Sequence, residues 1–170
     1  IEKKGSAQCK SSIIFAGMRT DGKTIIKAKK SRSHTEILCK YLKLPLKVRS
    51  KKNFDLIEIN KVKKINPLNY NIPSDISSAS FFLALTALSD DSKILIKNVN
   101  INPNRIGIVT IFKKMGITIN FRNKRIYKGE KIADIFISSP KNIKPINCPI
   151  NLNSSAIDEF LVIFLTVAAK

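Results

Sequence analysis

A short polar cluster, Ser6, Ala7 and Gln8, stands directly before an apolar helical pattern. The start of a helix presents backbone N–H groups without partners and the positive end of a dipole, and both attract a phosphate or carboxylate. Ser6 is also a residue type that caps helices without any ligand. The cluster therefore predicts a helix cap, an anion-binding site, or both.

Two further apolar helical patterns begin with similar residues, SSAS at Ser77 and SSAID at Ser154. If the three segments are related by symmetry, their helix N-termini converge and build a cleft that attracts anions. The third opening adds Asp158, whose spacing from Ser155 is also that of a helix capping box. A carboxylate at a helix N-terminus is stabilised in its ionised form, which suits a general base.

The predicted elements that carry these residues repeat along the chain. The first unit has the order helix, strand, helix, strand, strand, over Gln8–Met18, Thr24–Ala28, His34–Lys43, Leu46–Ser50 and Phe54–Ile59. After a polar bridge the order returns, over Ser77–Leu88, Lys93–Asn98, Asn104–Met115, Thr118–Phe121 and Asp134–Ile137, and a third opening helix follows over Ile157–Lys170. Such self-similarity indicates a fold assembled from copies of one α/β unit.

The chain of 170 residues has a formal net charge of +19, from 31 Lys and Arg against 12 Asp and Glu. The lysines are spread along the chain, and the phenylalanines lie in apolar runs instead of alternating with lysines as stacking platforms. We interpret the charge as compositional drift that also attracts anionic substrates, with nucleic-acid binding as the alternative. No apolar run is expected to reach the length of a membrane span.

Three cysteines, Cys9, Cys39 and Cys148, lie far apart and include no CxxC pair. Because His34 is the single histidine, a zinc site is not expected. Cys9 and Cys39 fall in helical patterns and are predicted to be small core residues. Reduced thiols fit a cytoplasmic protein, and a start at Ile1 fits a piece of a longer protein.

Six motifs in order carry a family resemblance: GSAQCKSSIIFAGM, SRSHTEIL, PSDISSASFFLALTAL, IKNVNINPNR, KKMG and IDEF. In this order and spacing the chain resembles the central portion of the 3-phosphoshikimate 1-carboxyvinyltransferases, also called EPSP synthases. The resemblance implies an α/β fold of repeated βαβαββ units, the two-lobed enolpyruvyl transferase fold or inverse α/β barrel, incomplete in this chain. Residues 1–71 would close one lobe and residues 72–170 would open the other, with a hinge crossing near Pro73.

The same resemblance implies that the complete protein transfers the enolpyruvyl group of phosphoenolpyruvate to the 5-hydroxyl of shikimate 3-phosphate and releases phosphate. This step belongs to the shikimate pathway, which leads to chorismate and the aromatic amino acids. The implied enzyme is a cytoplasmic monomer that needs no cofactor or metal and binds neither nucleic acid nor a membrane. The reaction needs cations and N–H donors for two phosphorylated anions, a group that moves a proton, and exclusion of water.

The resemblance also assigns substrate-binding residues. Ser6, Ala7 and Ser31 match positions that hold shikimate 3-phosphate, and Ala7 offers only its backbone N–H where some members have serine. Arg32 follows Ser31 and is expected to add a charged, bidentate contact to this substrate. Gln8 matches a residue that contacts both shikimate 3-phosphate and phosphoenolpyruvate.

Asp158 matches the catalytic aspartate of the family, which binds shikimate 3-phosphate and handles both its hydroxyl and the proton that moves at phosphoenolpyruvate. His34 stands where some members have tyrosine, and we expect it to bond locally or to border the shikimate site. Ser33 and Glu36 have the spacing of a capping box, and Glu159 is interpreted as a helix-start charge.

Alternatives to this function remain open at this point. The UDP-N-acetylglucosamine enolpyruvyl transferases share the fold, although SAQ and SRSHTE favour shikimate. A basic nucleic-acid-binding module would lose affinity steeply with salt, and a decayed, non-catalytic homologue would lack the remaining ligands. The Lys, Arg and Glu residues that complete the family site lie outside this chain, so we expect the 170 residues alone to be inactive.

Overall fold

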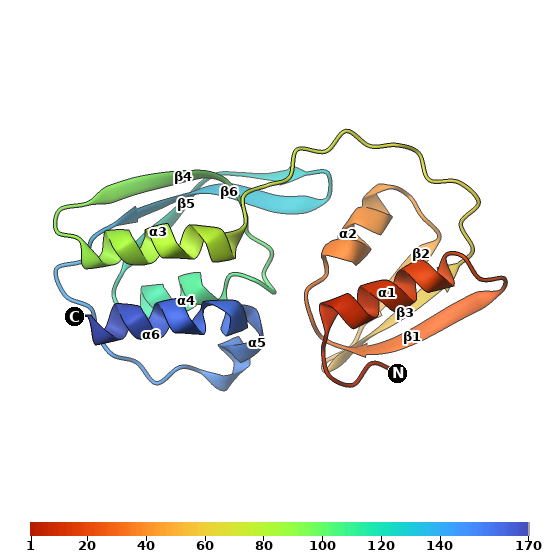
Figure 1. The fold of residues 1–170 in the computed structure, drawn as a ribbon, viewed down its shortest axis with the longest axis horizontal. Helices are drawn as coiled ribbons and strands as arrows, with labels where there is room; N and C mark the ends of the chain where they lie inside the picture. The colour runs from red at the N-terminus through yellow and green to blue at the C-terminus, as the bar shows by residue number, and fades with distance from the viewer. Residues whose placement is uncertain (170) are drawn as a thin grey trace. The chain divides into compact units, whose positions relative to one another are not determined.

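A computed structural model describes residues 1–169 and divides into two compact units, Ile1–Tyr70 and Asn71–Lys170, here called unit 1 and unit 2 (Figure 1). The lobe boundary predicted between residues 71 and 72 lies beside this division. That the two units belong to different lobes stays a prediction.

Unit 1 is a three-stranded antiparallel sheet with two helices on it. Its elements are α1 (Ala7–Gly17), β1 (Lys23–Lys29), α2 (His34–Tyr41), β2 (Leu46–Ser50) and β3 (Phe54–Asn60). The strand order is β1-β3-β2, so the last strand of the chain order lies in the middle of the sheet. Helix α1 packs on β1 and β3, and α2 packs on β2, around a core that includes Ile14, Ile26, Cys39, Ile57 and Ile59.

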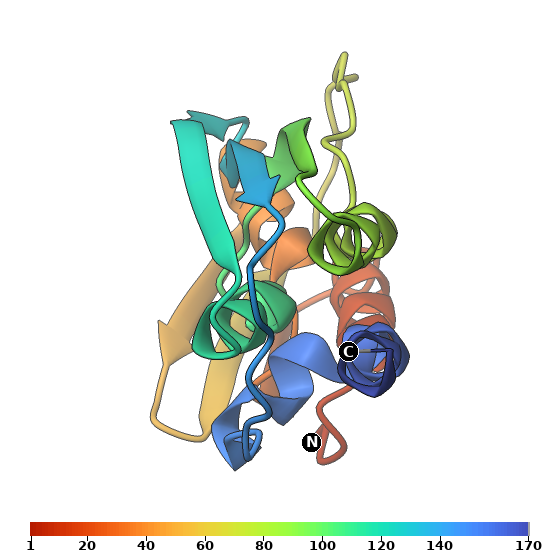
Figure 2. The same cartoon turned by 90° about the vertical axis from the view of Figure 1, so that its left-hand side faces the viewer.

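Unit 2 repeats this arrangement and then extends it. Its first elements are α3 (Ile76–Leu88), β4 (Lys93–Asn100), α4 (Gly107–Lys114), β5 (Thr118–Tyr127) and β6 (Glu130–Ser138), with the strand order β4-β6-β5. A helical series follows: η1 (Ile150–Leu152), α5 (Asn153–Ala156), η2 (Ile157–Glu159) and α6 (Phe160–Ala168). Figure 2 views α3 and α6 nearly end-on, where they lie beside each other, in agreement with the contacts between them.

The two units share one further feature that completes the predicted βαβαββ order. Before its first helix, each unit forms an isolated parallel bridge, between Glu2 and Ala28 in unit 1 and between Ser74 and Val99 in unit 2. Each bridge supplies a minimal first strand beside the strand that follows the helix. The predicted α/β fold of repeated βαβαββ units is therefore confirmed.

The hairpin of β5 and β6 is longer than predicted. The expected strands ended at Phe121 and resumed at Asp134, because half of the residues between them are charged and they show no apolar alternation. In the structure both strands continue to a two-residue turn at Lys128 and Gly129, whose φ angles are 48° and 90°. Positive φ at both turn positions matches the twist of a hairpin, so cross-strand hydrogen bonds carry the ribbon beyond the core.

A bulge on each outer strand of the second sheet meets one carboxylate on the middle strand. The register shifts between Ile96 and Val99 on β4 and between Arg122 and Arg125 on β5. The backbone N–H of Asn98 donates to Asp134 Oδ1 at 2.9 Å, and Asn123 Nδ2 donates to Asp134 Oδ2 at 2.7 Å. These two bonds hold the pKa of the Asp134 carboxyl below its ordinary value, so the ionised carboxylate fixes both bulges.

The third opening departs from the predicted single helix over Ile157–Lys170. Residues Ile157–Glu159 form the 3₁₀ segment η2, so the α-helix α6 begins only at Phe160. Lys170 lies outside the described residues. Helical structure nevertheless runs over Ile150–Ala168, 19 residues with a mean hydropathy of 1.4, which is long and apolar enough to cross a membrane by length and composition. The apolar run inside it begins only at Phe160, after Asp158 and Glu159, and is shorter than a membrane span, as expected.

The cysteine predictions have a mixed outcome. Cys39 is buried in the core of unit 1, as predicted, and burial raises the pKa of its thiol above the ordinary value. Cys9 is exposed, which is a correction. Helix α1 turns Lys10, Ile14 and Gly17 toward the sheet, so Cys9 lies on another side of the helix.

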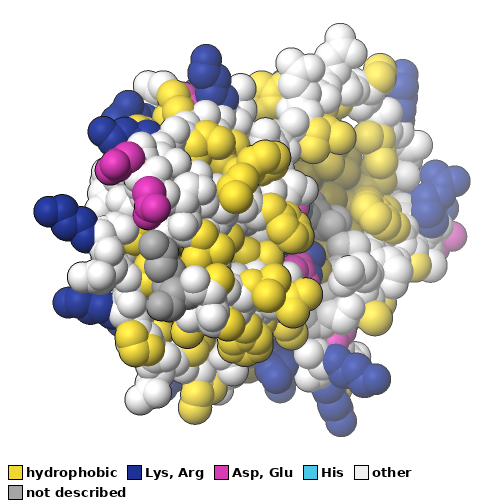
Figure 3. Space-filling view, turned by 60° about the vertical axis from the view of Figure 1, so that its left-hand side comes forward, with side chains coloured by type: hydrophobic (Ala, Val, Ile, Leu, Met, Phe, Trp, Pro, Cys, Tyr) yellow, Lys and Arg dark blue, Asp and Glu magenta, His cyan; other side chains and the backbone are white. Residues whose placement is uncertain are grey.

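Helices α3 and α6 leave large apolar side chains in solvent. In α3, Leu83 and Ala87 are fully buried, whereas Phe81, Phe82 and Leu85 are exposed. Helix α6 adds Leu161, Phe164 and Leu165, and hydrophobic side chains gather on the face shown in Figure 3. A helix that is apolar all round is normally buried, and no element of unit 2 within the described residues covers this face.

The close approach of α4 to α5 generates a stability prediction. A Cβ at Gly107 would lie 2.6 Å from Ser155 Oγ and 2.7 Å from the Ser155 carbonyl carbon. Gly107→Ala should therefore lower the free energy of unfolding by about 1–3 kcal/mol, measured by urea titration. Thr110→Ala, at an exposed position of the same helix, is the control and should change it by less than about 0.5 kcal/mol. Equal stability of the two variants would show that this contact is not tight.

Candidate functional site

Unit 1 has an open cavity where α1 begins and where the chain passes from β1 to α2. It is lined by Ala7, Gln8, Ser11, Arg32, His34 and Thr35. Three of the predicted substrate-binding residues, Ala7, Gln8 and Arg32, thus come together from two separate segments. His34 borders the same cavity.

Side chains of Ser6 and Glu2 accept hydrogen bonds from backbone N–H groups in and before the first turn of α1. Ser6 Oγ accepts a hydrogen bond from the Cys9 N–H at 3.2 Å, which confirms Ser6 as the helix cap. Ahead of it, the Glu2 carboxylate accepts hydrogen bonds from the N–H groups of Lys4 (2.8 Å), Gly5 (2.8 Å) and Ser6 (3.2 Å).

Gly5 adopts a φ of +80° in this loop, a conformation that glycine reaches without strain. Within the described residues, the N–H groups of Ala7 and Gln8 donate to no hydrogen-bond acceptor. They are the donors that α1 presents beside the cavity, at the positive end of the helix dipole.

A buried ion pair lies beneath this cavity, and sequence reasoning missed it. Lys10 Nζ is 2.6 Å from Glu36 Oε1 and donates to the Arg32 carbonyl oxygen at 2.8 Å. The predicted capping box of Ser33 and Glu36 is wrong, because Ser33 makes no side-chain capping bond and Glu36 turns to Lys10 instead. The S-x-x-E spacing fits both arrangements, and only the fold brings Lys10 within reach.

The charges around the cavity favour an anion. Arg32 lines it, whereas the acidic side chains nearest in sequence, Glu2 and Glu36, are both buried and bonded within unit 1. Ser31 directly precedes Arg32, and its hydroxyl oxygen is buried. Backbone N–H donors and a guanidinium that converge on one opening are suited to a phosphate group.

Asp158 lies in unit 2, in a cluster centred on Arg105. The Arg105 guanidinium donates to Asp75 Oδ1 at 2.9 Å and to Ser77 Oγ at 2.6 Å, and its Nη1 is 3.9 Å from Asp158 Oδ2. Arg105 is 13% exposed and Asp158 is 41% exposed, so the carboxylate is accessible while the cation beside it is largely covered. The cluster thus offers a partly exposed carboxylate held beside a fixed positive charge.

The helix openings in unit 2 are built differently from the predictions. The cap of α3 is Asp75, which accepts from the Ser78 N–H, whereas Ser77 lies inside the first turn. Ser155 lies inside α5 and donates to the Leu152 carbonyl at 3.0 Å, so its predicted capping box with Asp158 is wrong. The three openings resemble one another in sequence but do not share one capping scheme.

Glu159 belongs to the interior of the cluster and is not merely a helix-start charge. It is 1% exposed, and its carboxylate accepts a short hydrogen bond from Ser77 Oγ. Burial raises the pKa of the Glu159 carboxyl above its ordinary value of 4.5, although the Ser77 bond and the Arg105 charge oppose the shift. Neighbouring Asp158 and Asp75 add to the rise through like-charge repulsion.

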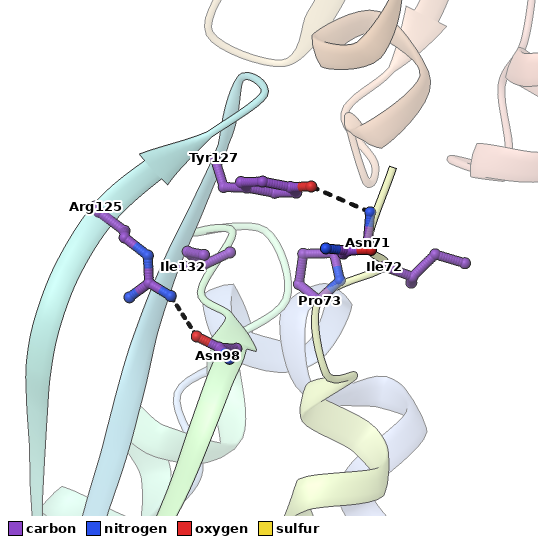
Figure 4. Close-up of a pocket in the computed structure, with 7 residues that line it drawn as sticks. All are labelled: Asn71, Ile72, Pro73, Asn98, Arg125, Tyr127 and Ile132. Atoms are coloured by element: carbon purple, nitrogen blue, oxygen red, sulfur yellow. Dashed lines mark hydrogen bonds between the residues drawn. The ribbon is translucent and has the colours of Figure 1, made fainter. Parts of the chain in front are cut away.

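A second cavity lies in unit 2 where the chain enters it, and none of the predicted site residues lines it (Figure 4). The Tyr127 hydroxyl accepts from the Asn71 N–H at 3.1 Å, and the Arg125 guanidinium donates to Asn98 Oδ1. These bonds tie the entering segment to the hairpin and to β4. Among residues 1–169, no group of three or more His, Cys, Asp or Glu side chains could hold a metal ion.

Comparisons with known proteins point to one family. A family model described as EPSP synthase (3-phosphoshikimate 1-carboxyvinyltransferase) matches residues 2–169. The 3-phosphoshikimate 1-carboxyvinyltransferase of Legionella pneumophila (strain Lens) is 39% identical over 166 residues, which cover 97% of this chain and 37% of the relative. That of Hydrogenovibrio crunogenus is 37% identical over 168 residues, which cover 96% and 37%.

A solved structure of an EPSP synthase from Acinetobacter baumannii superposes with a TM-score of 0.85 at 35% identity. The match covers 99% of this chain and 38% of that structure. The chain therefore spans little more than a third of the length of the relatives it matches.

The raised pKa of Glu159 generates a pH prediction. Because the folded state holds a proton that the unfolded chain gives up, the free energy of unfolding falls as the pH rises from 4.5 through the folded-state pKa. Glu159→Gln removes this loss. As the pH rises over that range, the free energy of unfolding of the variant should therefore increase relative to that of the wild type. Below pH 4.5 the difference between the two free energies should stay constant. Asp21→Asn, at a carboxylate that is 91% exposed, is the control. A constant difference between Glu159→Gln and the wild type at all pH values would contradict this account.

Proposed function

This chain belongs to the EPSP synthase family, and on that premise we propose that the complete protein is a 3-phosphoshikimate 1-carboxyvinyltransferase. It transfers the enolpyruvyl group of phosphoenolpyruvate to the 5-hydroxyl of shikimate 3-phosphate and releases phosphate. The observation that carries the proposal is the cavity of unit 1, where Ala7, Gln8 and Arg32 converge from two segments.

Unit 1 binds the phosphate group of shikimate 3-phosphate. The phosphate accepts from the N–H groups of Ala7 and Gln8, from Ser6 Oγ, and from the guanidinium of Arg32. Ser31, which directly precedes Arg32, completes the phosphate ligands. Gln8 lines the same cavity, and we propose that its amide, which carries both donors and an acceptor, also bonds phosphoenolpyruvate.

Asp158 in unit 2 supplies the proton chemistry. As the 5-hydroxyl oxygen bonds to carbon 2 of phosphoenolpyruvate, Asp158 takes the hydroxyl proton and delivers a proton to carbon 3, which gives a tetrahedral intermediate. Asp158 then removes a proton from carbon 3 as the bond between carbon 2 and the phosphate oxygen breaks. This restores the double bond, and the proton leaves with the phosphate. Arg105 holds a positive charge beside Asp158, with its Nη1 3.9 Å from Asp158 Oδ2.

The rest of the complete protein supplies what this chain lacks. We propose that residues 1–71 and 72–170 belong to separate lobes, that further repeats cover the apolar faces of α3 and α6, and that further basic residues bind phosphoenolpyruvate. The complete enzyme then works as a cytoplasmic monomer. The exposed Phe81, Phe82 and Phe164 side chains support the need for such a cover.

An assay of two protein forms tests the function. The complete protein that carries this chain should release phosphate from phosphoenolpyruvate with shikimate 3-phosphate and not with UDP-N-acetylglucosamine. The 170-residue chain alone should show no turnover, because it covers little more than a third of its relatives. Activity with the UDP-sugar alone would reverse the substrate assignment, and turnover by the 170-residue chain would refute the need for both lobes.

Asp158→Asn tests the catalytic assignment in the complete protein. The amide cannot accept the proton, so kcat should fall by about 10²–10⁴-fold, while KM for shikimate 3-phosphate changes little. Steady-state phosphate release measures both constants. Asp21→Asn, at an exposed turn of unit 1, is the matched control and should retain full activity. A kcat for Asp158→Asn close to that of the wild type would remove Asp158 from the proton transfer.

A further inference from the structure

Lys10 is fully buried, with 0% exposure. It lies on α1, one turn after the residues that open the helix, and faces the sheet together with Ile14 and Gly17. An ammonium group in such a place is costly unless it is paired and hydrogen-bonded. The mechanism proposed above does not use Lys10, so its presence needs a separate account.

The ammonium group of Lys10 makes two short contacts, one to α2 and one to the segment between β1 and α2. Its Nζ is 2.6 Å from Glu36 Oε1 and donates to the main-chain carbonyl of Arg32 at 2.8 Å. The neighbouring residue Ser11 makes a third contact, at 2.6 Å between its hydroxyl and that of Thr35. These side chains link the first turns of α1 to the segment from Arg32 to Glu36.

The ion pair has no evident advantage for stability over an apolar pair. Apolar residues of similar volume generally replace a buried ion pair without loss, whereas a buried ion pair fixes one geometry through directed bonds. The geometry fixed here is that between α1 and the main chain at Arg32. Both segments line the cavity of unit 1, whereas Lys10 does not.

We propose that Lys10 is a positioning residue that fixes the arrangement of the phosphate-binding groups of the cavity. By holding the Arg32 carbonyl against α1, it fixes the distance between the Arg32 guanidinium and the N–H groups of Ala7 and Gln8. Glu36 keeps the ammonium group in place and balances its charge. Lys10 acts through Arg32 and never touches the ligand. This inference rests on the proposed function, because it takes shikimate 3-phosphate as the occupant of the cavity.

Lys10→Met in the complete protein tests the inference, because methionine nearly keeps the volume and removes the ammonium group. KM for shikimate 3-phosphate and its Kd by calorimetry should both rise about 10-fold or more, as for the loss of hydrogen bonds from a charged group. We expect kcat and KM for phosphoenolpyruvate to stay within about 3-fold. Ile57→Val, a core substitution in β3, is the control; it should lower Tm and leave every kinetic constant unchanged.

Glu36→Gln is the second variant and decides the test if Lys10→Met does not fold. It keeps a hydrogen-bonding partner for Lys10 but removes the paired charge, so the Kd for shikimate 3-phosphate should rise about 3-fold or more. If a folded Lys10→Met, or in its absence Glu36→Gln, binds shikimate 3-phosphate as tightly as the wild type, the pair is structural only and the inference is overturned. A wild-type protein that does not bind shikimate 3-phosphate would instead overturn the proposed function.

Discussion

The pairing of Glu2 with Ala28 fixes where the candidate site of unit 1 forms. Two main-chain bonds make it, from the Glu2 N–H to Lys27 at 2.9 Å and from the Lys29 N–H to Glu2 at 3.0 Å. Because Glu2 is held beside the end of β1, the helix that follows it and the segment that follows β1 start from the same place. The Glu2 carboxylate then shapes the loop that leads into α1. The groups that can donate hydrogen bonds to an anion, from the start of α1 and from the segment after β1, are thus brought together by this pairing.

Unit 2 uses the same framework for a different set of charges. The bridge of Ser74 with Val99 places the opening of α3 beside the segment that follows β4, and that segment carries Arg105. In unit 1 the corresponding arginine, Arg32, lines a cavity, whereas Arg105 is bonded to Asp75 and Ser77. One topology therefore yields an anion-binding opening in one unit and, in the other, an opening whose arginine is paired with carboxylates. This division matches the separate roles proposed for Ser6–Gln8 and Asp158.

Sequence patterns predicted the order of elements well because apolar periodicity reflects burial, and burial repeats with the unit. The repeat, the α1 cap at Ser6 and the strand Leu46–Ser50 were all predictable in this way. The long hairpin was not predictable in this way, because the residues between Arg122 and Lys131 pair across the ribbon without forming an apolar face. The roles of Lys10, Glu2 and Glu36 were also missed. Their partners are set by tertiary contacts, and a short motif such as S-x-x-E cannot distinguish a cap from a buried ion pair.

We propose above that the opening of α1 and the segment at Arg32 hold the phosphate of shikimate 3-phosphate. A crystal structure of the complete protein with shikimate 3-phosphate tests it most directly. The phosphate should lie within hydrogen-bond distance of the N–H groups of Ala7 and Gln8 and of the Arg32 guanidinium. A phosphate bound elsewhere, with the cavity of unit 1 holding only water, would contradict it.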